Sequence, residues 1–301
     1  MTNPPEATPP ALAPPGIDPH ELERLQAKQE AHSARLREAG DRISSHPFAV
    51  SHRQQDVLRV GLEAVLIPNA RQLIDLLAAS ATNFELAVEL VQNARRSVVA
   101  EQFRAQLAQR LHNYFSAAYT LSEHMRTIMN VRRKQSKRIT DPLAAPLAAK
   151  KAELLSSPEV EFAVQLRGFI QHVAHVPVTT SLSMDGVNTS DRSFKSEIRL
   201  DVGELERGSR WEGEAQSFLA HREWVELRPV VNVYTSKLTV LYRWFIQQLI
   251  EEAEPLRGEH DQLIVEFNAL LTGTDLESAR ALTDETTKQW LSTVSPTGRV
   301  T

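Results

Sequence analysis

The feature that most constrains the fold is a run of apolar residues that recurs at three- and four-residue steps. The run consists of Leu107, Leu111, Tyr114, Phe115, Ala118, Leu121, Met125 and Ile128. This spacing places the side chains on one face of an α-helix, because the helix repeats about every 3.6 residues. We therefore expect a long helical stretch from about Phe84 to Val131, with a break near Arg95 and Arg96 and with this face buried.

The composition also favours long helices over sheets with tight turns. The 301 residues include only 11 glycines, and Leu, Ala and Val dominate the 42% of hydrophobic residues. The chain has no cysteine, which excludes disulfides and thiolate metal sites. The predicted fold class is mainly α, with enough apolar material for a core.

The charge and the ends of the chain narrow the function classes. A net charge of −4 argues against a protein that coats nucleic acid, although it allows a local basic groove. The first residues, Met1 to Pro5, form neither a basic nor an apolar run, so no signal peptide is expected. No segment approaches the length of a membrane span. We expect a cytoplasmic protein with no membrane partner.

The chain divides into four expected parts. Residues 1–17 hold six prolines and are predicted to be a disordered tail, because proline interrupts helices and the segment has little apolar material. Residues 18–46 are predicted to form an exposed charged helix, with Asp18 as the cap. Residues 47–272 are expected to form the helical domain, and residues 273–301 a polar tail with a short helix.

Prolines and a change of period organise the middle of the chain. Asp141-Pro142 and Pro146 predict a loop before a helix from about Pro158 to Val173. Alternating apolar and polar residues then predict one inserted β-hairpin at about 176–202. Beyond it we expect one or two short helices in residues 208–226, a strongly apolar helix from Pro229, and a last helix near residues 261–271.

A polar stripe adjoins the apolar face of the long helix. It consists of Asn113, Ser116, Thr120, Glu123 and His124. Such a stripe is either a solvated surface or one wall of a polar cleft. In the second case Asn113, Glu123 and His124 are candidates for polar support of a functional site.

The dense basic cluster of the sequence follows this helix. It consists of Arg132, Arg133, Lys134, Lys137 and Arg138. Such a cluster is either a solvated loop or a contact for the phosphates of RNA. It contains no aromatic residue, so it gives no support for base stacking.

The remaining candidates for chemistry are Arg167 and His172. Arginine can hold a phosphate through charge-assisted hydrogen bonds, and histidine can transfer protons near neutral pH. On a regular helix, five residues separate the two side chains by about 140°. The pair could cooperate if the helix unwinds before Pro177 or if two subunits pool their residues. Otherwise Arg167 forms a surface salt bridge and His172 favours the helix C-terminus.

The segment Leu166 to His172 resembles the Arg-x4-6-His motif of the HEPN superfamily, and residues 110–126 are similar to the long first core helix of such proteins. The resemblance implies a bundle of long antiparallel helices and a homodimer that binds RNA or cleaves it as a metal-independent endoribonuclease. It implies His172 as the acid and base, Arg167 at the phosphate, and no cofactor.

The residue after the motif arginine is typically polar in HEPN proteins, and Gly168 departs from this pattern. The alternative is a catalytically inactive helical interaction or oligomerisation protein. His175 follows His172 by three residues, but no Glu, Asp or Cys accompanies them in the sequence, so no metal is expected.

Overall fold

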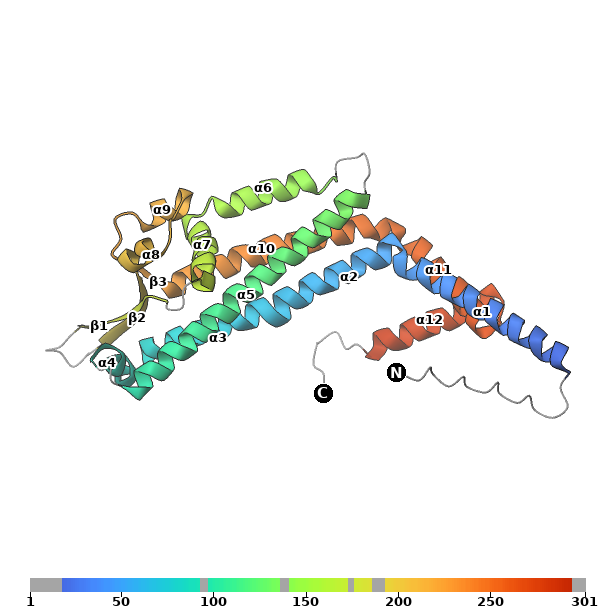
Figure 1. Cartoon of the computed structure of the whole chain (residues 1–301), viewed down its shortest axis with the longest axis horizontal. Coiled ribbons are helices and arrows are strands. Elements are labelled where there is room, and N and C mark those ends of the chain that lie inside the picture. Colours follow the sequence, from blue (N-terminus) through green and yellow to red (C-terminus); the bar gives the residue numbers. More distant parts are fainter. Residues whose placement is uncertain (1–17, 93–96, 136–140, 173–175, 186–192, 294–301) are drawn as a thin grey trace, which may run out of the picture. The chain divides into compact units, whose positions relative to one another are not determined.

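A computed structural model describes residues 18–92, 97–135, 141–172, 176–185 and 193–293 (Figure 1). The predicted fold class is confirmed, since the described chain is mainly α-helical with a small antiparallel sheet. In chain order the elements are α1 (Pro19–Ser45), α2 (Pro47–Val60), η1 (Gly61–Leu66), α3 (Ile67–Thr82), α4 (Phe84–Gln92), α5 (Val98–Gln135), α6 (Ala144–Leu155), α7 (Pro158–His172), β1 (Val178–Asp185), β2 (Ser193–Asp201), α8 (Val202–Gly208), α9 (Gly213–Leu219), β3 (Trp224–Glu226), α10 (Leu227–Ala253), η2 (Glu254–Leu256), α11 (Arg257–Thr272) and α12 (Leu276–Thr293).

Contacts divide the chain into two compact units. Residues 52–252 form one unit, and the two ends of the chain, up to residue 51 and from residue 253, form the other. We call them the central unit and the terminal unit. Because this division follows contacts in space, it joins segments that are far apart in sequence. The expected linear boundaries at 46/47 and 272/273 remain predictions, and the expected disordered tail lies outside the described residues.

The core of the central unit is built on α5. All eight residues of the apolar run are buried, which confirms the face predicted from the spacing. Tyr114 lies fully inside, and its hydroxyl lies 2.8 Å from the hydroxyl of Thr235 on α10. Burial raises the pKa of Tyr114 well above its usual range, because a phenolate would lose its hydration there. This hydrogen bond therefore ties α5 to α10 through a neutral phenol.

Residues 47–82 form one uninterrupted helical path with a π-helical segment, η1, in its middle. Pro68 lies in the first turn of α3, directly after η1. A proline in a regular helix lacks the N–H for one hydrogen bond and crowds the preceding turn. A π-helical segment next to it changes the hydrogen-bond pattern at that point. The path therefore continues through Pro68, where the sequence alone suggests an interruption.

The predicted loop between Asp141 and Pro158 is wrong, because α6 occupies residues 144–155. Asp141 starts this helix: its carbonyl accepts a hydrogen bond from the N–H of Ala144, and its carboxylate accepts one from Leu143. Pro146 is the third residue of α6. The first N–H groups of a helix have no acceptor within the helix, so a proline there costs no hydrogen bond.

The predicted hairpin is present as β1 and β2, which pair antiparallel with Val178 opposite Leu200 and Leu182 opposite Ser196. Ile198 and Leu200 are buried, and β2 packs against α3. The expected turn residues between the strands lie mostly outside the described part of the chain. The sequence did not predict β3, a third strand that pairs with the end of β2.

The segment expected to hold one or two short helices, residues 208–226, contains α9 and also the unexpected strand β3. Helix α8 begins directly after β2, where the Asp201 carboxylate caps it by accepting from the N–H of Glu204. Helix α9 follows, and β3 then leads straight into α10. Trp211 lies between these helices, where its ring stacks on Phe162 and its indole N–H donates to the carbonyl of Leu205.

The terminal unit consists of helices with little apolar interior. Asp18 caps α1 as predicted, since its side chain accepts a hydrogen bond from the N–H of His20. Helix α1 packs on α11, and α11 packs on α12. Gly273 ends α11 in the left-handed conformation with φ of 69°, which glycine adopts without strain. Helix α12 occupies 18 residues of the expected polar tail.

Candidate functional site

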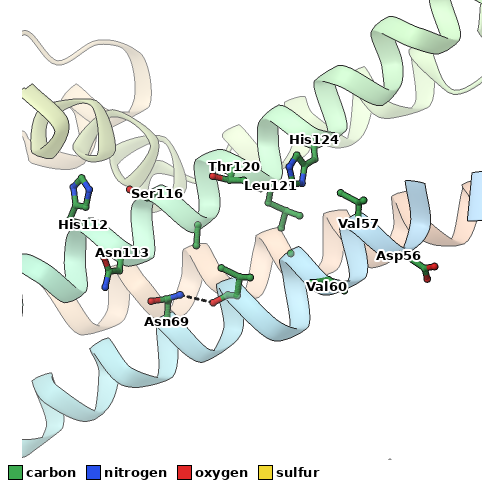
Figure 2. A pocket seen from close by; sticks show the side chains of 13 residues that line it. Asp56, Val57, Val60, Asn69, His112, Asn113, Ser116, Thr120, Leu121 and His124 are labelled. Carbon is green, nitrogen blue, oxygen red and sulfur yellow. Dashed lines mark hydrogen bonds between the residues drawn. The ribbon is translucent and has the colours of Figure 1, made fainter. Parts of the chain in front are cut away.

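The central unit has a hollow of about 720 Å³ between two of its long helical segments (Figure 2). One wall is formed by α2, η1 and the start of α3, and the other by the middle of α5. This volume lies within the range of about 300–1,000 Å³ that is typical of ligand sites. We call it the α2–α5 hollow.

The first wall is apolar and partly uncovered. Val57, Val60 and Val65 line it and are 46%, 58% and 41% exposed. Valine side chains clustered at a hollow are unusual on a fully solvated helix face, which is generally polar. Gly61 lies among them, and a Cβ atom there would come within 2.9 Å of Leu121 on α5. The helices therefore approach closely at Gly61, directly beside the valines.

The π-helical segment lies in the middle of this wall. Val57, Gly61, Val65 and Asn69 follow one another at four-residue steps, and all four line the hollow. In a regular α-helix each such step would rotate the side chain by about 40° around the axis. The wider turn of η1, between Gly61 and Leu66, takes up part of this rotation. The segment thus keeps the four residues in line along the hollow.

The second wall contains most of the polar stripe on α5. Asn113, Ser116, Thr120 and His124 line the hollow, as they would in the cleft alternative. The Nδ1 atom of His124 is buried and has no hydrogen-bond partner among the described residues. Glu123 is not part of the lining and forms an ion pair with Arg126, 2.6 Å away. The stripe therefore divides between the hollow and the neighbouring surface.

The two ends of the hollow differ in charge. Asp56 lies at one end, 3.1 Å from His52 and 3.6 Å from Arg59. His112 lies at the other end and is exposed. No lysine or arginine lines the hollow, so its described walls hold no permanent cation for a phosphate.

Arg167 lies outside this hollow, on α7, with its guanidinium 4.6 Å from the centre of the Tyr119 ring. Its Nε atom is buried without a hydrogen-bond partner, and none of the ion pairs of the described residues includes it. Burial raises the pKa of Tyr234 to about 12, and the nearby Arg167 charge opposes that rise. Arg167 is therefore a partly buried cation held by an aromatic ring instead of by a carboxylate.

Helix α7 continues to His172, so the backbone does not unwind between the two residues of the motif. Five residues of a regular helix place the two positions about 140° apart around the helix axis. The His172 side chain and all of His175 lie outside the described residues. Elsewhere in the described ranges, no three His, Asp or Glu residues gather as a metal ion would require.

The basic cluster is helical where the structure describes it, so the loop interpretation is wrong for its first three residues. Arg132, Arg133 and Lys134 form the last turn of α5, where cations favour the negative helix end. Arg132 forms ion pairs with Asp141 and Glu252, with a nitrogen–oxygen distance of 2.8 Å to each. Lys134 is exposed, and Lys137 and Arg138 lie outside the described residues.

Comparison with known proteins does not assign a family. No protein-family model matches the chain, and neither the curated proteins nor the solved structures include a match. Among the helices of the described residues, none is long and apolar enough to cross a membrane.

Proposed function

We propose that the chain is a HEPN-like RNA-binding protein in which Arg167 contacts a phosphate. The observation that supports this most is the guanidinium of Arg167, which is partly buried, stacked on Tyr119 and without a carboxylate among the described residues. Taking a cation out of water is unfavourable unless an anion accompanies it. A phosphate beside Arg167 would supply that charge.

The surroundings of Arg167 suit RNA better than a free anion. The Tyr119 ring lies against the guanidinium, and the N–H groups other than the buried Nε–H can donate to a phosphate. Tyr119 is 40% exposed, so its ring is open to solvent beside the arginine. Aromatic rings at such positions stack on unpaired bases, and the phosphates of the same strand pair with arginine. We expect single-stranded RNA as the ligand.

Cleavage is the further part of this proposal. His172 would take and return protons, and Arg167 would stabilise the charge on the phosphate, without a metal ion. The backbone of α7 stays helical through His172, and five residues of a regular helix place two positions about 140° apart around its axis. The reaction therefore needs Arg167 of one copy and His172 of another, and this part of the proposal requires a homodimer.

The binding test compares two arginines that both lie over an aromatic ring. Arg167→Ala should weaken binding of a labelled single-stranded RNA by about tenfold or more, because a hydrogen-bonded charge contact is lost. Arg222→Ala is the matched control, since Arg222 lies 4.3 Å from the Phe218 ring on another part of the unit. Fluorescence anisotropy at low salt measures both. Equal affinity of wild type and Arg167→Ala would contradict the proposal.

The cleavage test uses the same RNA with EDTA present. Wild type should shorten a broad RNA pool, and the Arg167→Ala/His172→Ala double variant should not. If wild type and the double variant both leave the pool intact, the endoribonuclease part is excluded while binding stays open to the first test.

The second candidate is an inactive helical interaction protein. It is favoured by the α2–α5 hollow, because three partly exposed valines beside a cavity are typical of a surface that a partner covers. RNA binding by wild type that is lost in Arg167→Ala would argue against it as the sole function.

A further inference from the structure

We propose that the α2–α5 hollow binds an uncharged small molecule that is apolar along one long edge and carries hydrogen-bonding groups, acceptors among them, along the other. The site is separate from the RNA proposal, because no residue that lines the hollow belongs to the Arg167 site. Its volume of about 720 Å³ is that of an ordinary ligand site. The class of molecule follows from the base of the hollow, its polar wall and its charges.

The base of the hollow is closed. A Cβ atom at Gly61 would come within 2.9 Å of Leu121, so the two walls already meet there. Leu121 and Ala117 are buried, whereas Val57 and Val60 on the facing wall are 46% and 58% exposed. An occupant therefore lies along the hollow and does not pass between the helices. Among the described lining residues the exposed apolar surface is confined to three valines, whereas a stable protein interface buries more than about 1,000 Å². A small molecule suits this restricted surface better than a protein partner.

The polar wall keeps its hydrogen-bonding groups available. On α10, Thr235 and Thr239 donate their hydroxyls to the carbonyl four residues back, at 2.7 and 2.8 Å. Ser116 and Thr120 form no such bond within the part of the chain that the structure describes. With Asn113 they follow one another at three- and four-residue steps, so they lie on one side of α5 (Figure 2). A ligand along this wall meets a row of hydroxyl and amide groups.

His124 adds a hydrogen-bond donor to this row. Its Nδ1 atom is buried and has no hydrogen-bond partner among the described residues. A buried N–H without an acceptor is rarer in proteins than a buried acceptor without a donor. We therefore place the proton of the neutral ring on Nε2, which can donate to a ligand. The ligand should carry an oxygen or nitrogen acceptor where it meets His124.

The charges of the hollow favour an uncharged ligand. A charged group that leaves water requires a partner of opposite charge. The described walls contain no lysine or arginine that would accompany an anion. The carboxylate of Asp56 could accompany a cation, but it already pairs with His52 and Arg59. A neutral molecule needs neither partner.

The first test measures binding of Nile red, an uncharged dye with an apolar ring system and oxygen acceptors, by its fluorescence. Wild type should bind it saturably, and the anionic dye anilinonaphthalene sulfonate at least about tenfold more weakly. Val60→Asp should weaken Nile red binding by at least about tenfold, because it places an unpaired charge beside the dye. Val240→Asp is the control, since Val240 is 61% exposed but lies on α10 outside the hollow.

Three outcomes of this first test would overturn the proposal. They are no saturable binding of Nile red by wild type, equal weakening by both variants, and tighter binding of the anionic dye.

The second test concerns the polar wall. The Ser116→Ala/Thr120→Val double variant removes two hydroxyls and should weaken Nile red binding by about tenfold, the size of one or two neutral hydrogen bonds. Thr127→Val is the control, because Thr127 is also exposed on α5 but does not line the hollow. If the double variant binds the dye as tightly as wild type, the polar edge of the proposed ligand is wrong.

The third test uses the absence of cysteine from the chain. Thr120→Cys places one thiol in the hollow, and Thr127→Cys places one outside it. Nile red at ten times its Kd should slow modification of the first thiol by N-ethylmaleimide about tenfold, because about one site in eleven is then free. The second thiol should react at an unchanged rate. Equal rates for Thr120→Cys with and without dye would place the dye elsewhere and overturn the proposal.

The two proposals can fail separately. RNA binding that is the same in wild type and Arg167→Ala would contradict the Arg167 site alone, and the dye experiments bear on the hollow alone.

Discussion

Arg132 joins three parts of the central unit through charge. Its guanidinium donates to both carboxylate oxygens of Asp141, at 2.8 and 2.9 Å, and pairs with Glu252 on α10. The side chain of Asp141 is only 5% exposed. Hydrogen bonds from Arg132 hold the pKa of that carboxyl below its usual range, and the same hydrogen bonds raise the pKa of Arg132. Arg132, which the sequence suggests as a contact for RNA phosphates, thus forms ion pairs that stabilise the fold.

Asp141→Asn should lower the free energy of unfolding by about 1–3 kcal/mol at neutral pH, because it removes the charge that Arg132 faces. The folded pKa of Asp141 lies below the unfolded value of about 3.9. The contribution is therefore present above that pH and is lost as the pH falls through the folded pKa. Urea denaturation should show the difference between wild type and variant closing below about pH 3.9.

The control for that experiment is Glu153→Gln on α6. Glu153 pairs with Lys150 at 3.0 Å, but both side chains are exposed. Exposed pairs of this kind contribute little. A loss of stability as large as that of Asp141→Asn would show that burial does not distinguish the two pairs.

Two glycines should respond in opposite directions to the same substitution. Gly168 lies in the interior of α7, and a Cβ atom added there would meet no atom within 4 Å, so Gly168→Ala should stabilise by about 0.5–1 kcal/mol. Gly61→Ala should destabilise by about 1 kcal/mol, because the added Cβ meets the buried Leu121 at 2.9 Å. Thermal and urea unfolding measure both. Stabilisation by both alanines would contradict the close approach at Gly61.

At the scale of elements, the periodic parts of the fold were predictable and the junctions were not. The buried face of α5 follows from residue spacing alone, and so do the paired strands β1 and β2. Helix α6 could not be predicted from the sequence. A proline such as Pro146 indicates the end of a helix unless it is known to lie in the first turn. β3 has three residues, too few for a period to appear.

The candidate site shows the same division. The polar wall of the hollow could be predicted from the polar stripe on α5. The sequence did not predict the opposite wall. Val57, Gly61, Val65 and Asn69 do recur at four-residue steps, with Pro68 beside them. A regular helix would rotate this series by about 40° at each step, and the π-helical segment takes up part of that rotation. The sequence holds no pattern that would predict such a segment.

Pro68→Ala should change the stability by less than about 1 kcal/mol, although proline in a helix interior costs about 3 kcal/mol. The π-helical segment before it already accommodates the missing N–H. Ala105→Pro in the interior of α5 is the contrast and should lose about 3 kcal/mol or more, because no such segment precedes it. A gain near 3 kcal/mol for Pro68→Ala in urea unfolding would mean that the proline is strained.

At the scale of the whole molecule, the buried core is distributed unevenly. The continuous cluster of buried apolar residues begins at Leu58 and ends at Leu249, all within the central unit. In the terminal unit, Val265 and Ala279 are the buried apolar residues on α11 and α12 among those described. Burial of apolar surface is the main stabilising contribution to folding, so the two units should differ in local stability.

Amide hydrogen exchange should reveal this difference. Backbone amides of α1, α11 and α12 should exchange faster than those of α5 and α10, because opening them exposes little apolar surface. Mass spectrometry of peptides from each helix measures the rates in the intact chain. Equal protection of α5 and α11 would contradict the expectation.

The direct junction between β3 and α10 limits how this protein can change in evolution. Glu226 ends the strand and Leu227 begins the helix, with no residue between them. One inserted residue would turn α10 by about 100° relative to the sheet. Val231, Tyr234 and Leu238 would then leave the core, since all three are buried on the present face. Homologous sequences should therefore vary in length elsewhere and keep this junction free of insertions and deletions.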